Sequence, residues 1–245
     1  MKIRVLTLFP EMIEPFFSSS IMKRAVKKGI VEYEIINFRD FANNAYNKVD
    51  DLPYGGGAGM VIMPDALSLA LESIGAKGKR VIFPTPSGRL FTQQDAQRLK
   101  EEDELVFICG HYEGIDQRVI DEYVSDEFSI GDYVLTSGET ASIVIIDAVF
   151  RLIDGVINKD SLSCESFNDK LLEYPQYTRS LRYCSNSVPD VLLSGNHAGI
   201  TNWRDEMRLK KTMQFRPDML SDASLSIKMR RKLINITDKE FLEDL

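Results

Sequence analysis

The sequence predicts an α/β fold with a mostly parallel sheet, followed by a smaller, mainly helical module. Strand and helix patterns alternate over the first 160 residues, which is typical of layered α/β domains. The run 105–109 is almost entirely apolar, as expected of a parallel strand that is buried on both faces. The alternation stops at 158–169 in a polar, Ser-rich stretch, which we interpret as a linker.

The ends of these elements have local causes. Pro10 is expected to stop the first strand, and Gly29 and Gly75 are expected to lie just past the ends of two helices. Thr92 is the expected N-cap of a further helix, with Asp95 three residues on. The predicted strands are 3–9, 31–38, 80–83 and 105–109, and the predicted helices are 21–28, 64–74, one that follows Thr92, and 139–153.

The composition is that of an ordinary soluble globular protein. Of 245 residues, 44% are hydrophobic and 27% are charged, which excludes collagen-like, low-complexity and disordered classes. No apolar run reaches the ~18 residues of a membrane-spanning helix, and the first residues are too short and strand-like for a signal peptide. Three scattered cysteines and two histidines argue against a disulfide framework and against a protein-only zinc site. We therefore expect a cytoplasmic protein with no membrane association.

The charge is distributed unevenly along the chain. The formal net charge is −7, which taken alone argues against a surface built for nucleic acid. Between 203 and 232, however, nine Lys and Arg stand against four Asp and Glu, so this segment carries +5 and the remainder −12. This asymmetry indicates an anionic partner near the C-terminus, with a solvated helical face as the equally weighted alternative.

A glycine-rich loop at 50–60 follows the second predicted strand. It holds four glycines within 55–59, which permit positive φ and close approach of the backbone to a ligand. It lacks the Gly-Lys-Ser/Thr of a P-loop and the G-x-G-x-x-G spacing of a dinucleotide fingerprint, so nucleoside triphosphate binding is excluded. The loop is either part of a site or a flexible turn between layers.

Three further loops, at 83–88, 109–118 and 129–139, gather glycines and polar residues at strand ends. Ligands of open α/β sheets bind outside the carboxyl ends of the strands, so these loops are candidate walls of one site. Glu113 is a candidate general base or hydrogen-bond acceptor, and a backbone-lined slot at 129–139 suits a nucleoside better than a phosphate. Tight connections, helix caps and a short edge strand are the structural alternatives. No G-x-S-x-G, C-x-x-C or H-E-x-x-H motif is present.

Several of these segments together form a more specific pattern. They are Leu-Phe-Pro-Glu-Met at 8–12, Val-Asp-Asp at 49–51 with Pro-Tyr-Gly-Gly-Gly at 53–57, Tyr-Glu-Gly-Ile-Asp at 112–116, the stretch 129–135, Tyr-Thr-Arg at 177–179 and Leu-Ser-Gly-Asn-His-Ala at 193–198. In this order they closely resemble the bacterial tRNA (guanine-N1)-methyltransferases of the knotted SPOUT class. The resemblance covers essentially the whole chain.

The resemblance implies a sheet with helices on both faces and a deep trefoil knot, which binds S-adenosylmethionine in a bent form. It implies a homodimer whose active sites lie at the subunit interface, and a reaction that magnesium supports. The implied substrate is the guanosine immediately 3′ of the anticodon in tRNA, whose methylation maintains the reading frame. By matching position, the cofactor-binding residues are Phe83, Pro84, Thr85, Pro86, Gly110, Tyr112, Glu113, Gly114, Ile130, Gly131, Asp132, Tyr133, Val134, Leu135 and Gly138.

The resemblance also assigns the catalytic groups. Guanine N1 becomes nucleophilic when a carboxylate removes its proton, and a cation near O6 stabilises the charge that develops. The family's arginine corresponds to Arg151, for which a cation at a helix C-terminus is the structural alternative. The family's base is an Asp directly before a Ser-Phe pair, whereas here Glu165 stands before Ser166-Phe167 in a linker one residue shorter. We expect Glu165 to be the base, because its extra methylene compensates for the shorter linker; Asp169 is the less suited substitute.

Two smaller departures from the family pattern are His111, where Arg is common, and Ala58, where Pro is common. The implied organisation is a knotted S-adenosylmethionine-binding domain at 1–157, a flexible linker at 158–170 and a helical tRNA-binding domain at 171–245. The expected tRNA-binding residues are His197, Arg204, Arg208, Lys210 and Lys211.

Two alternatives to an active methyltransferase are weighed. A catalytically inactive RNA-binding member of the same family is supported only by the glutamate at the position of the base. A nucleotide-dependent oxidoreductase requires a Rossmann fingerprint, which is missing.

Overall fold

The structure is a computed structural model that describes residues 1–158, 165–167, 169–222 and 225–243. The chain divides into two compact units, 1–158 and 159–245, and each is treated by itself. Within the described ranges, no helix is both long and apolar enough to cross a membrane.

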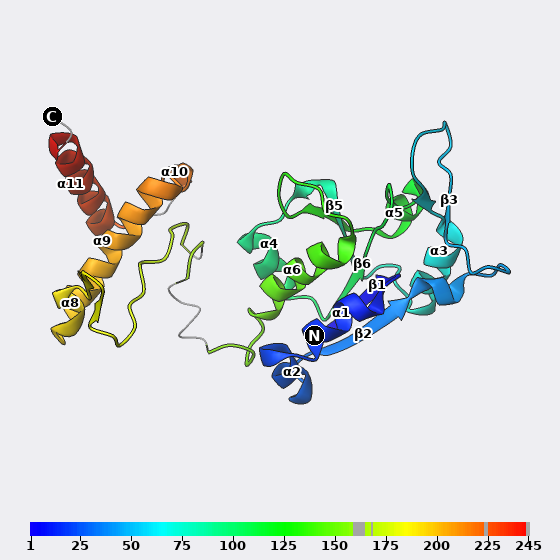
Figure 1. The fold of residues 1–245 in the computed structure, drawn as a ribbon, viewed down its shortest axis with the longest axis horizontal. Helices are drawn as coiled ribbons and strands as arrows, with labels where there is room; N and C mark the ends of the chain where they lie inside the picture. Colours follow the sequence, from blue (N-terminus) through cyan, green and yellow to red (C-terminus); the bar gives the residue numbers. More distant parts are fainter. Residues whose placement is uncertain (159–164, 168, 223–224, 244–245) are drawn as a thin grey trace. The chain divides into compact units, whose positions relative to one another are not determined.

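The first unit is built on a five-stranded sheet whose strands are all parallel (Figure 1). The strand order is β2-β1-β6-β5-β7. The central strand β6 is buried over its last four residues, as the apolar run at 105–109 predicts. The predicted α/β class with a mostly parallel sheet is therefore confirmed. The strands are β1 (Lys2–Thr7), β2 (Glu32–Asn37), β5 (Arg80–Leu90), β6 (Glu104–Ile108) and β7 (Asp126–Ser129).

Helices cover both faces of this sheet. Successive strand residues point to opposite faces, so Val5 and Phe107 join one hydrophobic cluster while Leu6 and Ile108 join the other. The first cluster is completed by α1 (Pro10–Phe17), α2 (Ser20–Lys27), α4 (Gln93–Leu99) and α6 (Gly138–Phe150). The second is completed by α3 (Pro64–Ser73), α5 (Gln117–Tyr123) and the short 3-10 helix η1 (Phe38–Phe41).

The predicted end signals of three helices are confirmed. The Thr92 hydroxyl accepts a hydrogen bond from the Asp95 N–H, and the Asp95 carboxylate accepts one from the Thr92 N–H, which forms a capping box at the start of α4. Gly29 and Gly75 lie just past α2 and α3 with φ of 68° and 59°, a conformation that glycine adopts without steric cost.

Other boundaries differ from the sequence expectation. The first strand ends at Thr7, and Pro10 begins α1, where a backbone N–H is not needed. The pattern does not predict α1, whose interior contains Pro15, or the short α5. It also misses β7, which begins with two acidic residues, and it ends β5 at 83 although the strand continues to Leu90.

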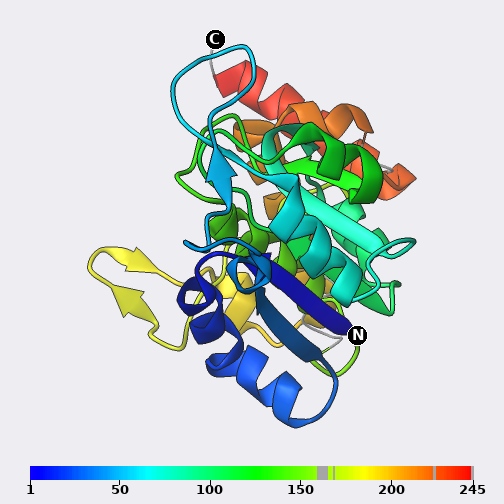
Figure 2. The same ribbon diagram turned by 90° about the vertical axis from the view of Figure 1, so that its right-hand side faces the viewer.

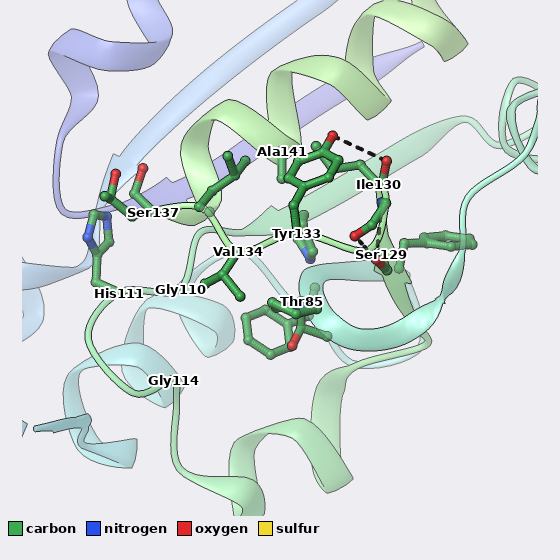
Figure 3. A pocket seen from close by; sticks show the side chains of 18 of the residues that line it. Thr85, Gly110, His111, Gly114, Ser129, Ile130, Tyr133, Val134, Ser137 and Ala141 are labelled. Atoms are coloured by element: carbon green, nitrogen blue, oxygen red, sulfur yellow. Dashed lines mark hydrogen bonds between the residues drawn. The ribbon is translucent and has the colours of Figure 1, made fainter. Parts of the chain in front are cut away.

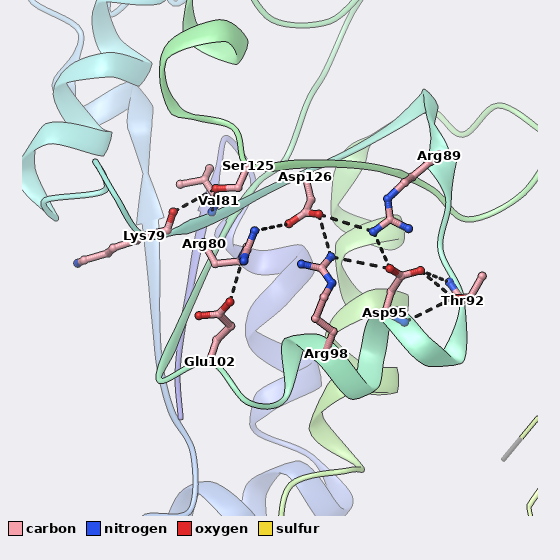
Figure 4. A network of polar contacts seen from close by, with 10 residues as sticks. All are labelled: Lys79, Arg80, Val81, Arg89, Thr92, Asp95, Arg98, Glu102, Ser125 and Asp126. Atoms are coloured by element: carbon pink, nitrogen blue, oxygen red, sulfur yellow. Dashed lines mark hydrogen bonds and ion pairs between the residues drawn. The ribbon is translucent and has the colours of Figure 1, made fainter.

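The acidic start of β7 is stabilised by arginines from neighbouring elements (Figure 4). Asp126 accepts hydrogen bonds from Arg98 at 2.8 Å and from Arg80 at 3.3 Å. Arg89 donates to Asp95 at 2.6 Å. Burial opposes the charge of Asp95, but the hydrogen bonds from Arg89 and Thr92 outweigh it, so the pKa of this carboxyl lies below its usual value. The network joins β5, α4 and β7.

The glycine-rich loop forms the end of a hairpin between β3 (Asp50–Asp51) and β4 (Val61–Ile62). The hairpin extends outward from the first unit in both views (Figures 1 and 2). The base of the hairpin is fixed to the loop at 109–118, because the Ile62 N–H donates to Gly114 O and the Asp116 N–H donates to Ile62 O, both at 3.0 Å.

The second unit is mainly helical, as predicted. Its hydrophobic core contains Leu171, Leu209 and Ile236, which come from the chain before the helices, from α9 and from α11. A short hairpin, yellow in Figure 2, precedes the helices. The elements are β8 (Arg182–Tyr183), β9 (Asn186–Ser187), α8 (Asp190–Leu193), α9 (His197–Phe215), α10 (Asp218–Asp222) and α11 (Ile227–Glu243).

Candidate active site

A pocket of about 250 Å³ opens beside the middle of β5 and the carboxyl ends of β6 and β7 (Figure 3). Its walls come from the three segments that the sequence singles out, at 83–88, 109–118 and 129–139. Every residue expected to bind the cofactor lines it except Asp132. Four more lining residues, His111, Ser129, Thr136 and Ser137, belong to the loops predicted as walls, and only Phe128 and Ala141 lie outside them.

The first wall is an excursion within β5. Both Pro84 and Arg89 pair with Phe128 of β7, so the intervening residues leave the strand and form a loop beside the pocket. Gly88 returns the chain to the sheet. A Cβ at Gly88 would lie 2.6 Å from the Phe128 nitrogen, so only glycine allows this approach.

The second wall is the close contact between the end of β6 and the start of α6. The Gly138 N–H donates to Gly110 O at 2.8 Å, and a Cβ at Gly138 would lie 2.6 Å from the Gly110 nitrogen. A Cβ at Gly110 would lie 2.9 Å from the Phe83 ring. The absence of side chains at these two glycines thus brings backbone and the Phe83 ring together at the base of the pocket.

The third wall is the loop after β7, which turns tightly over the pocket (Figure 3). Gly131 has a φ of 151° and the Tyr133 N–H donates to its carbonyl at 2.9 Å. The Tyr133 hydroxyl donates to Ile130 O at 3.3 Å, which folds the ring over Gly131. Beyond it, Val134 has 81% of its surface exposed although it borders the pocket.

A buried polar group lies behind the second wall. Glu139 is fully buried at the start of α6, and it accepts hydrogen bonds from Thr7 Oγ1 and from His111 Nε2, the latter at 2.8 Å. Its Oε2 atom also lies 2.8 Å from His111 Nε2, although it makes no further polar contact within the described part of the chain. His111 therefore connects this carboxylate to the pocket. Two sequence signals point to this residue, namely its place in the predicted wall loop 109–118 and the departure from the family's arginine at 111.

The cysteine beside the pocket is not a nucleophile. Cys109 is fully buried, and burial raises the pKa of its thiol, with the nearby Glu139 carboxylate adding to the effect. Its sulfur lies 3.3 Å from the Ser142 hydroxyl.

Glu113 is placed by the glycine-rich loop. Its N–H donates to Met60 O at 3.0 Å, and a Cβ at Gly59 would lie 2.3 Å from Glu113 Oε1. Gly59 has a φ of 87°, so this position requires glycine for its conformation and for its space. The hairpin is therefore more than a turn between layers, because it sets the position of a carboxylate that borders the pocket.

The two predicted catalytic residues lie in different units. Arg151 follows the last turn of α6 as its C-cap and is half-buried. Glu165 begins the described part of the second unit and is also half-buried. Most of the predicted linker before it, at 159–164, and residue 168 lie outside the described residues.

The predicted tRNA-binding residues lie on α9 of the second unit. His197 is its first residue and is exposed. The Arg204 guanidinium lies 4.7 Å from the centre of the Tyr174 ring, on the wall of a second pocket. Lys210 is exposed and pairs with Glu206 at 3.0 Å, and Lys211 is also exposed.

Arg208 differs from these residues. Its side chain is only 11% exposed, and its guanidinium donates to both carboxylate oxygens of Asp169. No group of three or more His, Cys, Asp or Glu arranged to hold a metal occurs among the residues that the structure describes.

Comparison with known proteins identifies the family. The model of the tRNA (Guanine-1)-methyltransferase TrmD family matches residues 1–222. A tRNA (guanine-N(1)-)-methyltransferase of Treponema denticola is 56% identical over 223 residues, which cover 91% of this chain and 92% of the relative. Enzymes of the same name from Macrococcus caseolyticus and Treponema pallidum are 53% and 54% identical, over 100% and 92% of this chain and 98% and 90% of the relatives. The resemblance drawn from the sequence is confirmed: the chain belongs to the tRNA (guanine-1)-methyltransferase family.

Proposed function

We propose that this protein transfers a methyl group from S-adenosylmethionine to N1 of a guanosine in tRNA, namely the one immediately 3′ of the anticodon, and so maintains the reading frame. The observation that carries the proposal is the coincidence of the family match with a glycine-lined pocket beside the middle of β5 and the carboxyl ends of β6 and β7. Nothing in the comparisons supports the inactive alternative. The proposed compartment is the cytoplasm.

The pocket residues fit this methyl donor. Phe83, Ile130 and Leu135 supply apolar wall for an adenine ring, and the close contact of Gly110 with Gly138 forms the base of the pocket. S-adenosylmethionine supplies a methyl group already activated by a positively charged sulfur. The protein's part is therefore to hold the donor and the guanine in line.

The acceptor requires proton transfer. We assign to Glu165 the removal of the proton from guanine N1, and to Arg151 the stabilisation of the negative charge that develops on O6. Glutamate is the longer of the two acidic residues, which suits a base presented from a linker one residue shorter than the family's. On this proposal, 1–157 binds the donor, 171–245 binds the tRNA and 158–170 carries the base.

We further propose that the active form is a homodimer with its active sites at the subunit interface. Apolar side chains stay exposed on the rim of the donor pocket, with Tyr133 at 54%, Val134 at 81% and Leu135 at 40%, as expected of a surface that a second copy covers. Magnesium is proposed to support the reaction. The described residues offer no cluster of ligands for it, so its oxygen ligands are proposed to come largely from the RNA.

The proposal is tested by labelled-methyl transfer from S-adenosylmethionine to unmodified tRNA transcripts. Two transcripts are compared, one with guanosine immediately after the anticodon and one with adenosine there. Transfer to the first alone is the expected result. Folded protein that binds the donor but transfers no methyl group to either transcript would contradict the proposal and favour the inactive RNA-binding alternative.

The assignment of the base is tested by Glu165→Gln. We expect kcat to fall by about 10²–10⁴-fold, the usual contribution of a general base, while the Kd for S-adenosylmethionine stays within about twofold. Glu165→Asp is the matched control, because it keeps a carboxylate and should retain more activity than the glutamine variant. Full turnover by Glu165→Gln would show that another group removes the proton.

A further inference from the structure

Arg208 and Asp169 form a bidentate ion pair within the second unit. Arg208 Nη1 donates to Asp169 Oδ2 at 2.9 Å, Nη2 donates to Oδ1, and Nε donates to Leu172 O at 3.3 Å. All three guanidinium nitrogens thus point at one short segment of chain. A planar guanidinium that bonds both oxygens of a carboxylate is among the stronger and more directional polar contacts in proteins.

The segment that Arg208 holds is the one that follows the proposed base. Ser166 Oγ accepts a hydrogen bond from the Glu173 N–H at 2.9 Å, and the Phe167 N–H donates to Leu171 O at 3.0 Å. Both Phe167 and Lys170 have positive φ, at 73° and 62°, a backbone conformation that is unfavourable for residues other than glycine. The described residues of this turn therefore require stabilising contacts from other parts of the second unit.

Helix α9 supplies those contacts. Leu171 is 1% exposed and packs with Leu209 in the core of the unit. The Leu172 N–H donates to Thr212 Oγ1 at 3.0 Å, and Arg208 lies one turn before Thr212 on the same face. A buried leucine, a backbone hydrogen bond and the Arg208 ion pair fix the turn on the helix.

We infer that Arg208 is a positioning residue: through Asp169 it holds residues 165–167 and 169–173 on α9 and so places the carboxylate of Glu165 for the reaction, instead of binding tRNA phosphate. The inference deepens the proposed function and rests on it for the role of Glu165. Arg208 would have to break its pair with Asp169 to reach a phosphate, whereas Lys211 is exposed on the same helix. The same pairing occupies both oxygens of Asp169, which makes this residue poorly suited to act as the base.

The two roles predict different kinetics. Loss of a phosphate contact raises the KM for tRNA and lowers the salt dependence of binding, whereas loss of a positioning contact lowers kcat and leaves the affinity for tRNA nearly unchanged. For Arg208→Gln and for Asp169→Asn we expect kcat to fall at least tenfold, with the KM for tRNA and the Kd for S-adenosylmethionine within about twofold. The double variant should be no worse than either single variant, because both remove one interaction.

Lys211→Gln is the matched control for a loss of charge on α9. We expect it to raise the KM for tRNA and to reduce the slope of log K against log[salt] by about 0.7–0.9. A charge swap, Arg208→Asp with Asp169→Arg, should recover part of the lost kcat. Amide hydrogen exchange at Leu172 and Glu173 should become faster in Arg208→Gln, while exchange in the core of α9 is unchanged.

The inference is overturned if Arg208→Gln behaves like Lys211→Gln, with a raised KM, an unchanged kcat and a smaller salt slope. It is also overturned if exchange at Leu172 and Glu173 is the same in Arg208→Gln as in the parent protein. These outcomes are distinct from failure of the proposed function. If Glu165→Gln retains full turnover while Arg208→Gln loses it, the base assignment fails and the positioning role of Arg208 stands. If the parent protein transfers no methyl group, the exchange measurement still tests whether Arg208 holds Leu172 and Glu173 on α9.

Discussion

A methyl group added at Gly138 would meet the backbone at the end of β6. The Cβ of an alanine there would lie 2.6 Å from the Gly110 nitrogen, 3.0 Å from Cys109 Cα and 3.1 Å from the Cys109 carbonyl carbon. These neighbours are backbone atoms just past the end of the central strand, and Cys109 is fully buried. They cannot move aside as the end of a flexible side chain would.

Two effects of opposite sign compete in Gly138→Ala. In an isolated helix, alanine is favoured over glycine by about 1 kcal/mol. Here, restoring an ordinary contact of 3.4 Å from 2.6 Å requires a relative shift of about 0.8 Å between α6 and β6, and overpacking of this kind costs about 1–3 kcal/mol or more. We expect the steric effect to win, so that the free energy of unfolding falls by about 1–2 kcal/mol.

The assays are urea denaturation, for the free energy of unfolding, and calorimetric titration with S-adenosylmethionine. Because Gly110 and Gly138 both line the pocket, we expect the Kd for the donor to rise at least tenfold, equivalent to about 1.4 kcal/mol. Gly199→Ala in α9 is the control. A Cβ at this position would lie 3.2 Å from the Asn196 side-chain nitrogen, so it would meet a side chain instead of backbone. A Gly138→Ala protein more stable than the parent, with unchanged affinity for the donor, would refute the close-packing argument.

Two further substitutions test other contacts. Asp95→Asn should lower the free energy of unfolding by about 1–2 kcal/mol at neutral pH. Because the pKa of Asp95 is lowered in the fold, the stabilisation is fully present above the unfolded-state value of about 4 and is lost as the pH falls through the lower, folded-state value. The denaturation curves of parent and variant should therefore converge below that folded-state pKa. A constant difference at all pH values would exclude the ionised carboxylate as the cause. Gly59→Ala should displace Glu113 and weaken donor binding in calorimetry with little loss of urea stability, whereas unchanged binding would show that Glu113 does not contact the donor.

Features fixed by short-range chemistry were predictable from the sequence. The capping box at Thr92 and Asp95 depends on two residues in one turn of chain. The positive φ at Gly29 and Gly75 follows from the need to end a helix with a residue that lacks a Cβ. The burial of β6 follows from its apolar run. Each of these signals lies within the element that it describes.

Features that depend on distant partners were not predictable. The acidic start of β7 is acceptable in a strand because Arg80 and Arg98 reach Asp126 from other elements. The sequence places His111 in a wall loop of the site but does not show that its ring bonds to Glu139, 28 residues later. The sequence predicts Arg208 to bind tRNA, like the other basic residues nearby, because nothing in it indicates an acidic partner 39 residues earlier. The sequence gives the charge of a residue, whereas the fold determines which residue of opposite charge pairs with it.

The order of the strands in the sheet constrains how the first unit can form. β1 pairs with β2 about 30 residues later and with β6 about 100 residues later, while both partners of β5, the strands β6 and β7, follow it in the chain. During synthesis, the apolar residues of β5, among them Val81 and Ile82, therefore remain without a neighbouring strand until β6 has been made. Folding governed by such long-range pairings is slow, and waiting apolar strands are prone to aggregate. The newly made chain is therefore expected to benefit from chaperones until β6, β7 and α6 have all been synthesised.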